Sequence, residues 1–230
     1  QGKMSADDKD EIIGRITVGS GYAAASEADI VVEAIFEDMV IKKKTFAALD
    51  EAAPDRTIFA SNTTSLSISE MASATSRPDK VCGMHFFNPP VVMKLVEIMP
   101  GIGTSQETVG AVSALAEKLG KKPVHARFDS PAGIGSRVLA GSLNEAVEVF
   151  AQGLASAEDI DAALKMGCGF PMGPLELIDL IGVDIHLAKT ETLYRELGDQ
   201  RYRPNFILKK MVRAGHLGRK SGRGFYTYED

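Results

Sequence analysis

In the first half of the chain, apolar runs of strand length alternate with segments that have the periodicity of helices. The run Asp29 to Phe36 (DIVVEAIF) is almost continuously apolar, which is typical of a strand covered on both faces. An amphipathic segment follows at 37–53, and the run 57–62 (TIFASN) predicts the next strand. Strands that alternate with helices in this way predict an α/β fold with a largely parallel, doubly wound sheet.

The pattern changes near Asp129. Before it, the runs KVCGMHFF, VMKLVEIM and KPVHARF predict three more strands. After it, strand-like runs disappear and segments of helical periodicity follow one another to residue 215. We therefore expect two domains, an α/β domain over residues 1–129 and an all-helical domain over residues 130–230.

Composition narrows the kinds of partner. Hydrophobic residues make up 44% and charged residues 25% of the 230 residues, which is ordinary for a globular protein. The net charge of −5 gives no reason to expect nucleic acid or an anionic membrane as partner. No apolar run reaches the roughly 18 residues of a membrane span and no signal peptide opens the chain, so we expect a cytoplasmic protein with reduced cysteines. The four histidines are scattered, and we predict no metal site.

The stretch Gly83 to Met99 (GMHFFNPPVVMKLVEIM) carries a histidine and a glutamate in otherwise apolar runs. A lone His85 in a strand is more often a buried histidine that hydrogen-bonds to the backbone. Glu97 favours another interpretation, because a carboxylate in an apolar strand is costly unless it is paired. If the two strands are neighbours, Glu97 accepts from one imidazole nitrogen and makes the other more basic, which gives a general-base pair. A salt bridge between Glu97 and Lys94 is the structural alternative.

Polar side chains follow the predicted strands at one edge of the sheet. The cluster SNTTS (61–65) follows one strand, Glu37 follows another, and Asn88 precedes a proline corner. In open α/β sheets, ligands bind beyond the carboxyl ends of the strands. Each group also has a structural explanation: the cluster 61–65 can cap a helix, Glu37 can interact with a helix dipole, and Asn88 can initiate a turn. Together they indicate a binding site at this edge.

Four longer stretches resemble the short-chain 3-hydroxyacyl-CoA dehydrogenase family, most closely its bacterial 3-hydroxybutyryl-CoA members. The resemblance covers essentially the whole chain and implies a Rossmann domain followed by a helical domain that forms a homodimer contact. It implies NAD-linked oxidation of an (S)-3-hydroxyacyl-CoA, four-carbon in type, to the 3-ketoacyl-CoA, or the reverse reduction; NADP stays open. The stretches are SNTTSLSISEMASAT, MHFFNPPVVMKLVEIM, EDIDAALKMGCGFPMGPLELIDLIG and GRKSGRGFYTY.

The resemblance also implies roles for individual residues. His85 matches the catalytic base, Glu97 the carboxylate that orients it, and Asn88 an asparagine near the nicotinamide and the thioester. Thr64 stands where the family has a serine that binds substrate and cofactor. Ser136 replaces an active-site asparagine that binds substrate. The expected cofactor contacts are Glu37, Lys42, Thr64, Asn88 and Lys220.

Two departures from the family pattern lead to further expectations. The segment around Ser136 gains Gly133 and Gly135, which we expect to loosen it. No G-x-G-x-x-G follows a buried strand in this chain, so we expect a truncated Rossmann domain that lacks its first, glycine-rich half. One alternative to the enzyme is therefore a non-catalytic, dimerising remnant with weak acyl-CoA binding. A hydroxyacid dehydrogenase with a lysine base is a third, disfavoured by the His85–Glu97 pair.

Overall fold

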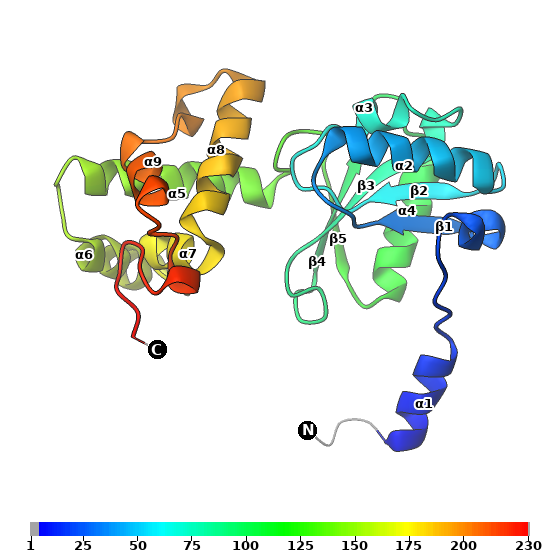
Figure 1. Cartoon of the computed structure of the whole chain (residues 1–230), viewed down its shortest axis with the longest axis horizontal. Helices are drawn as coiled ribbons and strands as arrows, with labels where there is room; N and C mark the ends of the chain where they lie inside the picture. The colour runs from blue at the N-terminus through cyan, green and yellow to red at the C-terminus, as the bar shows by residue number, and fades with distance from the viewer. Residues whose placement is uncertain (1–4, 230) are drawn as a thin grey trace.

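A five-stranded sheet organises the first half of the chain. The structure is a computed structural model that describes residues 5–229, so residues 1–4 of the predicted α/β domain and residue 230 lie outside the described residues. The sheet forms one side of the molecule and the helical region the other (Figure 1). Its strands, in spatial order, are β1 (Ile30–Glu33), β2 (Ile58–Ser61), β3 (Val81–Phe86), β4 (Leu95–Pro100) and β5 (Lys122–His125).

The sheet is mixed, whereas the sequence predicted a largely parallel one. The pairs β1–β2, β2–β3 and β4–β5 are parallel, but β3 and β4 are antiparallel. The reason is the short connection at 87–94, because a parallel crossover needs about a dozen residues or more. The antiparallel register places His85 directly opposite Glu97. The α/β class is confirmed, with this one pair reversed.

Helices cover both faces of the sheet. On one face, Phe59 of β2 packs against α2 and α3, and its ring lies edge-on to Phe46 at 5.9 Å between centroids. On the other face, Cys82 and Met84 of β3 pack against Val112 of α4. The alternation of neighbouring residues between two buried faces explains why the strand runs are apolar throughout. The helices of this half are α1 (Ala6–Gly14), η1 (Ala23–Glu27), α2 (Met39–Ala52), α3 (Ile68–Ala72), η2 (Pro78–Lys80) and α4 (Gln106–Lys118).

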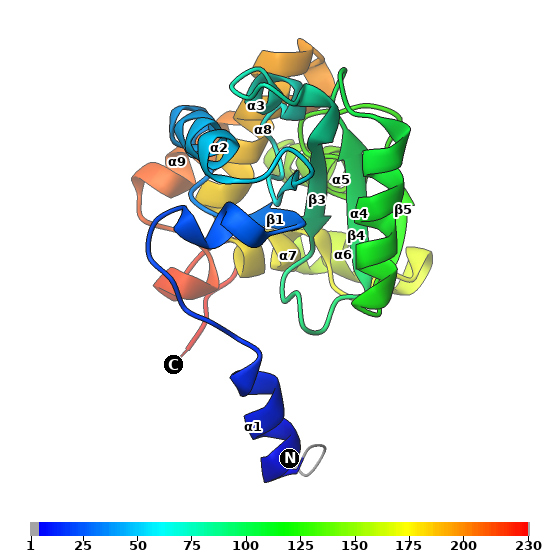
Figure 2. The ribbon, with the colours of Figure 1, turned by 90° about the vertical axis from the view of Figure 1, so that its right-hand side faces the viewer.

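Short polar side chains determine where several helices begin. Asp38 accepts the N–H of Ile41 at the start of α2, and Ser105 accepts the N–H of Thr108 at the start of α4. Helix α1 differs from the others, because it has no buried residue and extends away from the sheet (Figure 2). No helix within residues 5–229 is long and apolar enough to cross a membrane.

The second half of the chain is helical, as expected, and has its own core. Leu143 and Val147 of α5, Ile178 of α7 and Leu208 of α9 are buried together. Asp179 of α7 accepts backbone N–H groups from the C-terminal segment, which fastens that segment to the helices. The elements are α5 (Gly135–Ala151), α6 (Ala157–Ala162), the π-helix η3 (Ala163–Gly167), α7 (Pro174–Ile181), α8 (Val183–Leu197), η4 (Gln200–Tyr202), α9 (Phe206–Arg213) and η5 (Arg219–Ser221).

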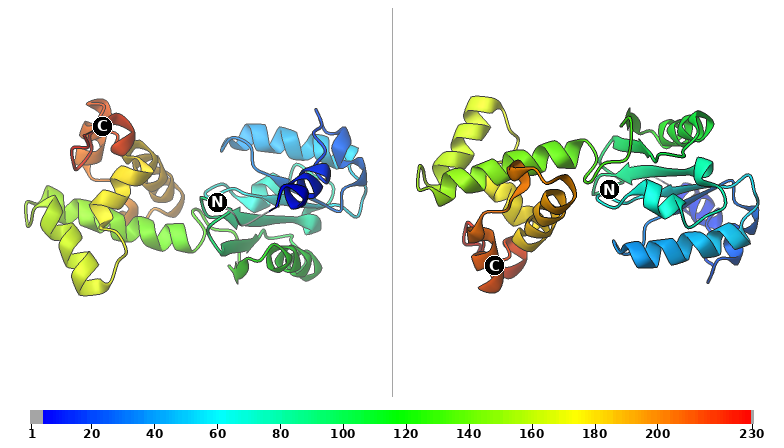
Figure 3. Two further views of the ribbon diagram at one scale, coloured as in Figure 1. Left: turned by 90° about the horizontal axis from the view of Figure 1, so that it is seen from below. Right: turned by 90° about the horizontal axis from the view of Figure 1, so that it is seen from above.

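The two halves are joined by the connection 126–134 between β5 and α5 (Figure 3). Asp129 is held in this connection by the hydroxyl of Ser67, at 2.7 Å, and by the backbone N–H of Ser69, at 2.9 Å. The predicted domain boundary at residues 129/130 falls here, and the division into two domains stays a prediction. Because this connection is fixed at Asp129, the first residues of α5 lie next to Glu97.

Candidate active site

The predicted pair of His85 and Glu97 is present in the structure. The two residues face each other across β3 and β4, and His85 Nδ1 lies 3.1 Å from Glu97 Oε2. Both are buried, with 5% and 1% of their surfaces exposed. The side chains meet because directly opposed residues of an antiparallel pair project from the same face of the sheet.

Glu97 is held on its other side by the start of the helical region. Its Oε1 accepts the backbone N–H of Gly135 at 2.6 Å. Burial by itself raises the pKa of Glu97, but the hydrogen bonds from His85 and Gly135 outweigh burial and bring this pKa below its ordinary value. Glu97 is therefore an ionised acceptor with one oxygen for the imidazole and one for α5.

Gly133 and Gly135 have a different role from the one that we expected. Gly133 has a φ of +55°, and a Cβ on it would lie 2.3 Å from Glu97 Oε2. A Cβ on Gly135 would lie 3.2 Å from the ring of Phe87. The absence of side chains at these positions lets the backbone approach Glu97 closely, which holds the carboxylate rather than loosening the segment.

The second nitrogen of His85 faces the loop after β2. Its Nε2 lies 3.1 Å from the hydroxyl oxygen of Thr64. Because Glu97 only accepts hydrogen bonds, the proton of the neutral imidazole belongs on Nδ1, and Nε2 is left with a free electron pair. In that tautomer the Thr64 hydroxyl donates to Nε2. The arrangement can remove a proton from a hydroxyl group that binds beside Thr64 Oγ1 and Nε2.

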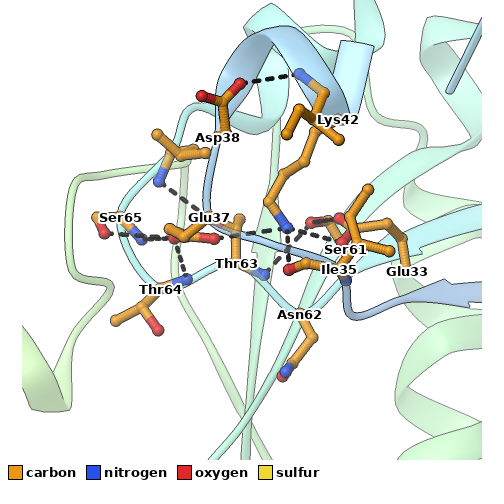
Figure 4. Close-up of polar contacts among 12 residues, drawn as sticks. Glu33, Ile35, Glu37, Asp38, Lys42, Ser61, Asn62, Thr63, Thr64 and Ser65 are labelled. Carbon is orange, nitrogen blue, oxygen red and sulfur yellow. Dashed lines mark hydrogen bonds and ion pairs between the residues drawn. The ribbon is translucent and has the colours of Figure 1, made fainter. Parts of the chain in front are cut away.

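Glu37, a predicted cofactor contact, lies across this same loop (Figure 4). Its Oε1 accepts the hydroxyl of Thr63 at 2.6 Å and the backbone N–H groups of Thr64 and Ser65 at 3.0 Å each. Burial raises the pKa of Glu37, yet these hydrogen bonds and the charge of Lys42 lower it overall. The loop is thus wrapped around an ionised carboxylate.

Lys42, the second predicted cofactor contact, has its ammonium inside the protein. Its Nζ lies 2.7 Å from Glu33 Oε1 and 3.4 Å from Glu37 Oε2, and 1% of its side chain is exposed. Sequence reasoning missed Glu33, which also accepts the Ser61 hydroxyl at 2.6 Å. Glu33 carries the same signal that revealed Glu97, a carboxylate in an apolar strand run. A cofactor contact for Lys42 stays a prediction.

Asn88 and Ser136 border the pair from two directions. Asn88 is exposed at the start of the connection between β3 and β4, after Phe87, whose ring lies 4.9 Å from the imidazole between centroids. Ser136 is buried in the first turn of α5, next to the Gly135 that binds Glu97. Asn88 follows His85 by three residues and Ser136 follows the Gly135 that binds Glu97, and their contacts to substrate stay predictions.

Lys220 is not brought to this site. Its Nζ forms an ion pair with Asp184 Oδ1 at 2.6 Å, in the region where η5 packs against α7. Its predicted contact to the cofactor stays a prediction, and its present partner belongs to the helical region. Among residues 5–229 there is no group of His, Cys, Asp and Glu side chains that could hold a metal ion.

An imidazole–carboxylate pair on β3 and β4 of a helix-covered α/β sheet, beside the loop that follows β2, fits the class of nicotinamide-dependent dehydrogenases. Family models agree with this assignment. The model described as 3-hydroxyacyl-CoA dehydrogenase, NAD binding domain, matches residues 1–129, and the model of the C-terminal domain of the same enzymes matches residues 134–228. The chain belongs to the 3-hydroxyacyl-CoA dehydrogenase family.

Individual relatives match over nearly the whole chain. The probable 3-hydroxybutyryl-CoA dehydrogenase of Bacillus subtilis is 48% identical over all of this chain and 80% of its own length. The 3-hydroxybutyryl-CoA dehydrogenase of Clostridioides difficile is 48% identical over 99% of this chain and 81% of its own length. The crystal structure of (S)-3-hydroxybutyryl-CoA dehydrogenase from Ralstonia eutropha has a TM-score of 0.96 and 45% identity, covering 99% of this chain and 80% of that one.

One expectation is corrected by these matches. We predicted a Rossmann domain that lacks its first half, but the NAD-binding-domain model matches residues 1–129, so this prediction is wrong. The reason is that a missing glycine motif concerns a single turn. The strands from β1 to β5, the helices between them and the polar strand ends carry the family pattern without it.

Proposed function

We propose that this protein is an NAD-linked dehydrogenase that oxidises (S)-3-hydroxyacyl-CoA, with 3-hydroxybutyryl-CoA as substrate, to the 3-ketoacyl-CoA, and that catalyses the reverse reduction. The observation that carries the proposal is the buried pair of His85 and Glu97, with a free imidazole nitrogen 3.1 Å from a hydroxyl group. The relatives at 48% identity are named for this activity.

His85 is the general base of the proposed reaction. Its Nε2 takes the proton of the substrate 3-hydroxyl, which the Thr64 hydroxyl, held beside that nitrogen, is proposed to bind. Glu97 keeps the proton on Nδ1 and stabilises the imidazolium that forms. In the direction of reduction, the imidazolium returns the proton to the new alkoxide oxygen.

The residues at the carboxyl edge of β1 fit a nicotinamide cofactor. A groove of about 530 Å³ is lined by Ala34, Ile35, Phe36, Ile41 and Thr45. Its apolar lining suits the faces of flat rings, and Glu37, Thr64 and Asn88 are proposed to supply polar contacts beside it. A nicotinamide bound there would supply the acceptor for the hydride that leaves C3 of the substrate.

The remaining predicted residues complete the proposal. Asn88 and Thr64 are proposed to bind both substrate and cofactor, Ser136 the substrate, and Lys42 and Lys220 the cofactor. We further propose a homodimer formed through the helical region, an acyl-CoA as the binding partner, and a cytoplasmic location. The free thiols Cys82 and Cys168 suit a reducing compartment.

A non-catalytic remnant is the alternative that the observations disfavour. A remnant has no need to keep a buried carboxylate, which is costly, beside a histidine with a free nitrogen. The intact pair, the Thr64 hydroxyl and the match of the whole chain to 80% of a relative named as a dehydrogenase support the enzyme.

The test is acetoacetyl-CoA-dependent oxidation of NADH by the 230-residue chain. We expect turnover, and we expect His85→Gln to lower kcat by about 10²- to 10⁴-fold, because general-base catalysis has this magnitude. The matched control is His125→Gln, since His125 is an exposed histidine on β5 whose ring contacts Ser113. Turnover that survives in His85→Gln at the level of the control would contradict the assignment of the base.

A further inference from the structure

A buried ion pair lies beside the loop that carries Thr64. The Lys42 ammonium lies 2.7 Å from Glu33 Oε1, and the side chains are 1% and 2% exposed. Removing two charges from water is costly, and a buried ion pair is seldom more stabilising than apolar residues of the same size. The presence of this pair between β1 and α2 therefore needs an explanation other than stability.

Lys42 connects the pair to the catalytic histidine. Its Nζ lies 3.4 Å from Glu37 Oε2, while the other oxygen of Glu37 accepts the N–H groups of Thr64 and Ser65. The Thr64 hydroxyl in turn lies 3.1 Å from His85 Nε2. A continuous series of polar contacts thus runs from the buried ammonium to the reacting nitrogen, and Figure 4 shows its first part.

Glu33 reaches the same loop by a second route. Its Oε2 accepts the Ser61 hydroxyl at 2.6 Å, and Ser61 Oγ accepts the N–H of Thr63 at 3.3 Å. Its Oε1 accepts the N–H of Ile35 at 2.7 Å in addition to Lys42. Glu33 therefore ties together the ends of β1 and β2, and the loop that carries Thr64 follows β2.

We propose that Glu33 and Lys42 are positioning residues of the active site. They hold Glu37 and the loop 61–65 so that the Thr64 hydroxyl lies against His85 Nε2. Neither residue touches the substrate. Glu33 acts through Thr64, and Lys42 does so in addition to its proposed contact to the cofactor. This inference rests on the proposed function, since it explains how the base of that reaction is kept in place.

The experiment is a double-mutant cycle between Glu33→Gln and Thr64→Val. Both replacements keep the size of the side chain, and each is expected to lower kcat/KM for acetoacetyl-CoA by about 3- to 10-fold, the range for one hydrogen bond between neutral groups such as the Thr64 hydroxyl and the imidazole. If Glu33 acts through Thr64, the double variant is no worse than Thr64→Val alone. Losses that multiply would overturn the inference.

The matched control for the buried charge is Lys43→Met. Lys43 is the neighbour of Lys42 on α2, is partly exposed and lies 3.6 Å from Glu70, so its loss should leave kcat/KM unchanged. Lys42→Met is expected to lower it as Glu33→Gln does. Equal effects of Lys42→Met and Lys43→Met would contradict a role for the buried pair.

A second measurement keeps the inference testable if the proposed function fails. The ¹⁵N NMR signal of His85 Nε2 reports the hydrogen bond from Thr64 whether or not the protein turns over acetoacetyl-CoA. We expect this signal to move in the same direction in Glu33→Gln and in Thr64→Val. An unchanged signal in Glu33→Gln overturns the positioning role, whereas absent turnover in the unaltered chain overturns only the proposed function.

Ser61→Ala covers the case in which Glu33→Gln does not fold. It removes the hydroxyl that Glu33 Oε2 binds and leaves the Glu33–Lys42 charges in place. We expect a smaller change of the His85 signal in the same direction. An unaltered His85 signal in a folded Ser61→Ala variant would contradict the inference.

Discussion

Gly133 gives the sharpest test of how Glu97 is held. In Gly133→Ala the new Cβ would lie 2.3 Å from Glu97 Oε2 and 3.1 Å from the sulfur of Met99. The carboxylate must move by roughly 1 Å to restore an ordinary contact distance. A displacement of about 1 Å in catalytic machinery costs roughly 100-fold in rate, so we expect kcat/KM to fall by about that factor.

The matched control is Gly120→Ala. Gly120 has a φ of +71°, close to the +55° of Gly133, but a Cβ on it would meet nothing within 4 Å. Both substitutions carry the same backbone strain, roughly 1–2 kcal/mol for an L-residue in this region. We therefore expect Gly120→Ala to lose a few degrees in Tm from backbone strain alone, Gly133→Ala to lose more because it also displaces Glu97, and activity to fall in Gly133→Ala only.

The assay combines a thermal melt with acetoacetyl-CoA-dependent NADH oxidation for the two variants. If both variants lose activity to the same degree, the loss comes from backbone strain and the argument from the Glu97 contact is wrong. If Gly133→Ala keeps full activity, Glu97 tolerates the displacement, and its close hold by the segment 133–135 has no catalytic consequence.

Three further predictions concern stability in urea. Ala132 is buried with a φ of +64°, so Ala132→Gly should raise the free energy of unfolding by about 1 kcal/mol, and a lower urea midpoint would contradict this. Burial, helped by the charge of Lys189, lowers the pKa of His186 to about 4, so the unfolded chain binds a proton that the folded chain does not. Stability should therefore fall by up to about 3 kcal/mol as pH falls from about 6.5 to 4, and His186→Leu should flatten that slope in urea midpoints. Asp179→Asn should cost about 2–4 kcal/mol and expose the C-terminal segment to proteolysis, because Asp179 accepts N–H groups from Phe225 and Tyr226; an unchanged midpoint would refute this.

Periodicity was sufficient to predict the fold class, because strands buried on both faces must be apolar throughout. The strands β2 and β3 show this directly, whereas β1 lies at the edge of the sheet and its run is only partly covered, with Val32 42% exposed. The direction of β4 could not be read from its own residues, since an apolar strand of six residues has the same pattern in either direction. Only the short connection at 87–94 determines that β3 and β4 are antiparallel.

The site could be predicted where a charged side chain stands in an otherwise apolar strand run. Glu97 in β4 was such a case, and its partner His85 followed from the assumption that β3 and β4 are neighbours. The second contact of Glu97 was not predictable, because Gly135 lies 38 residues further along the chain and donates only its backbone N–H. Every residue type except proline has a backbone N–H, so the sequence does not reveal which of them donates to a side chain. The two glycines therefore suggested flexibility in the sequence, although in the structure they give the carboxylate its space.

The same rule, that a carboxylate in an apolar run needs a partner, also applies to Glu33, and the nature of the partner distinguishes the two sites. Glu97 contacts an imidazole whose other nitrogen is free to exchange a proton, so the pair can take part in a reaction. Glu33 contacts an ammonium that is buried and shared with Glu37, and neither Glu33 nor Lys42 has a group that exchanges a proton with His85, so the pair positions the loop that does reach it. A carboxylate in an apolar strand run therefore indicates where a site lies. Whether that site is catalytic or positions other groups depends on the partner of the carboxylate and on whether this partner contacts a ligand.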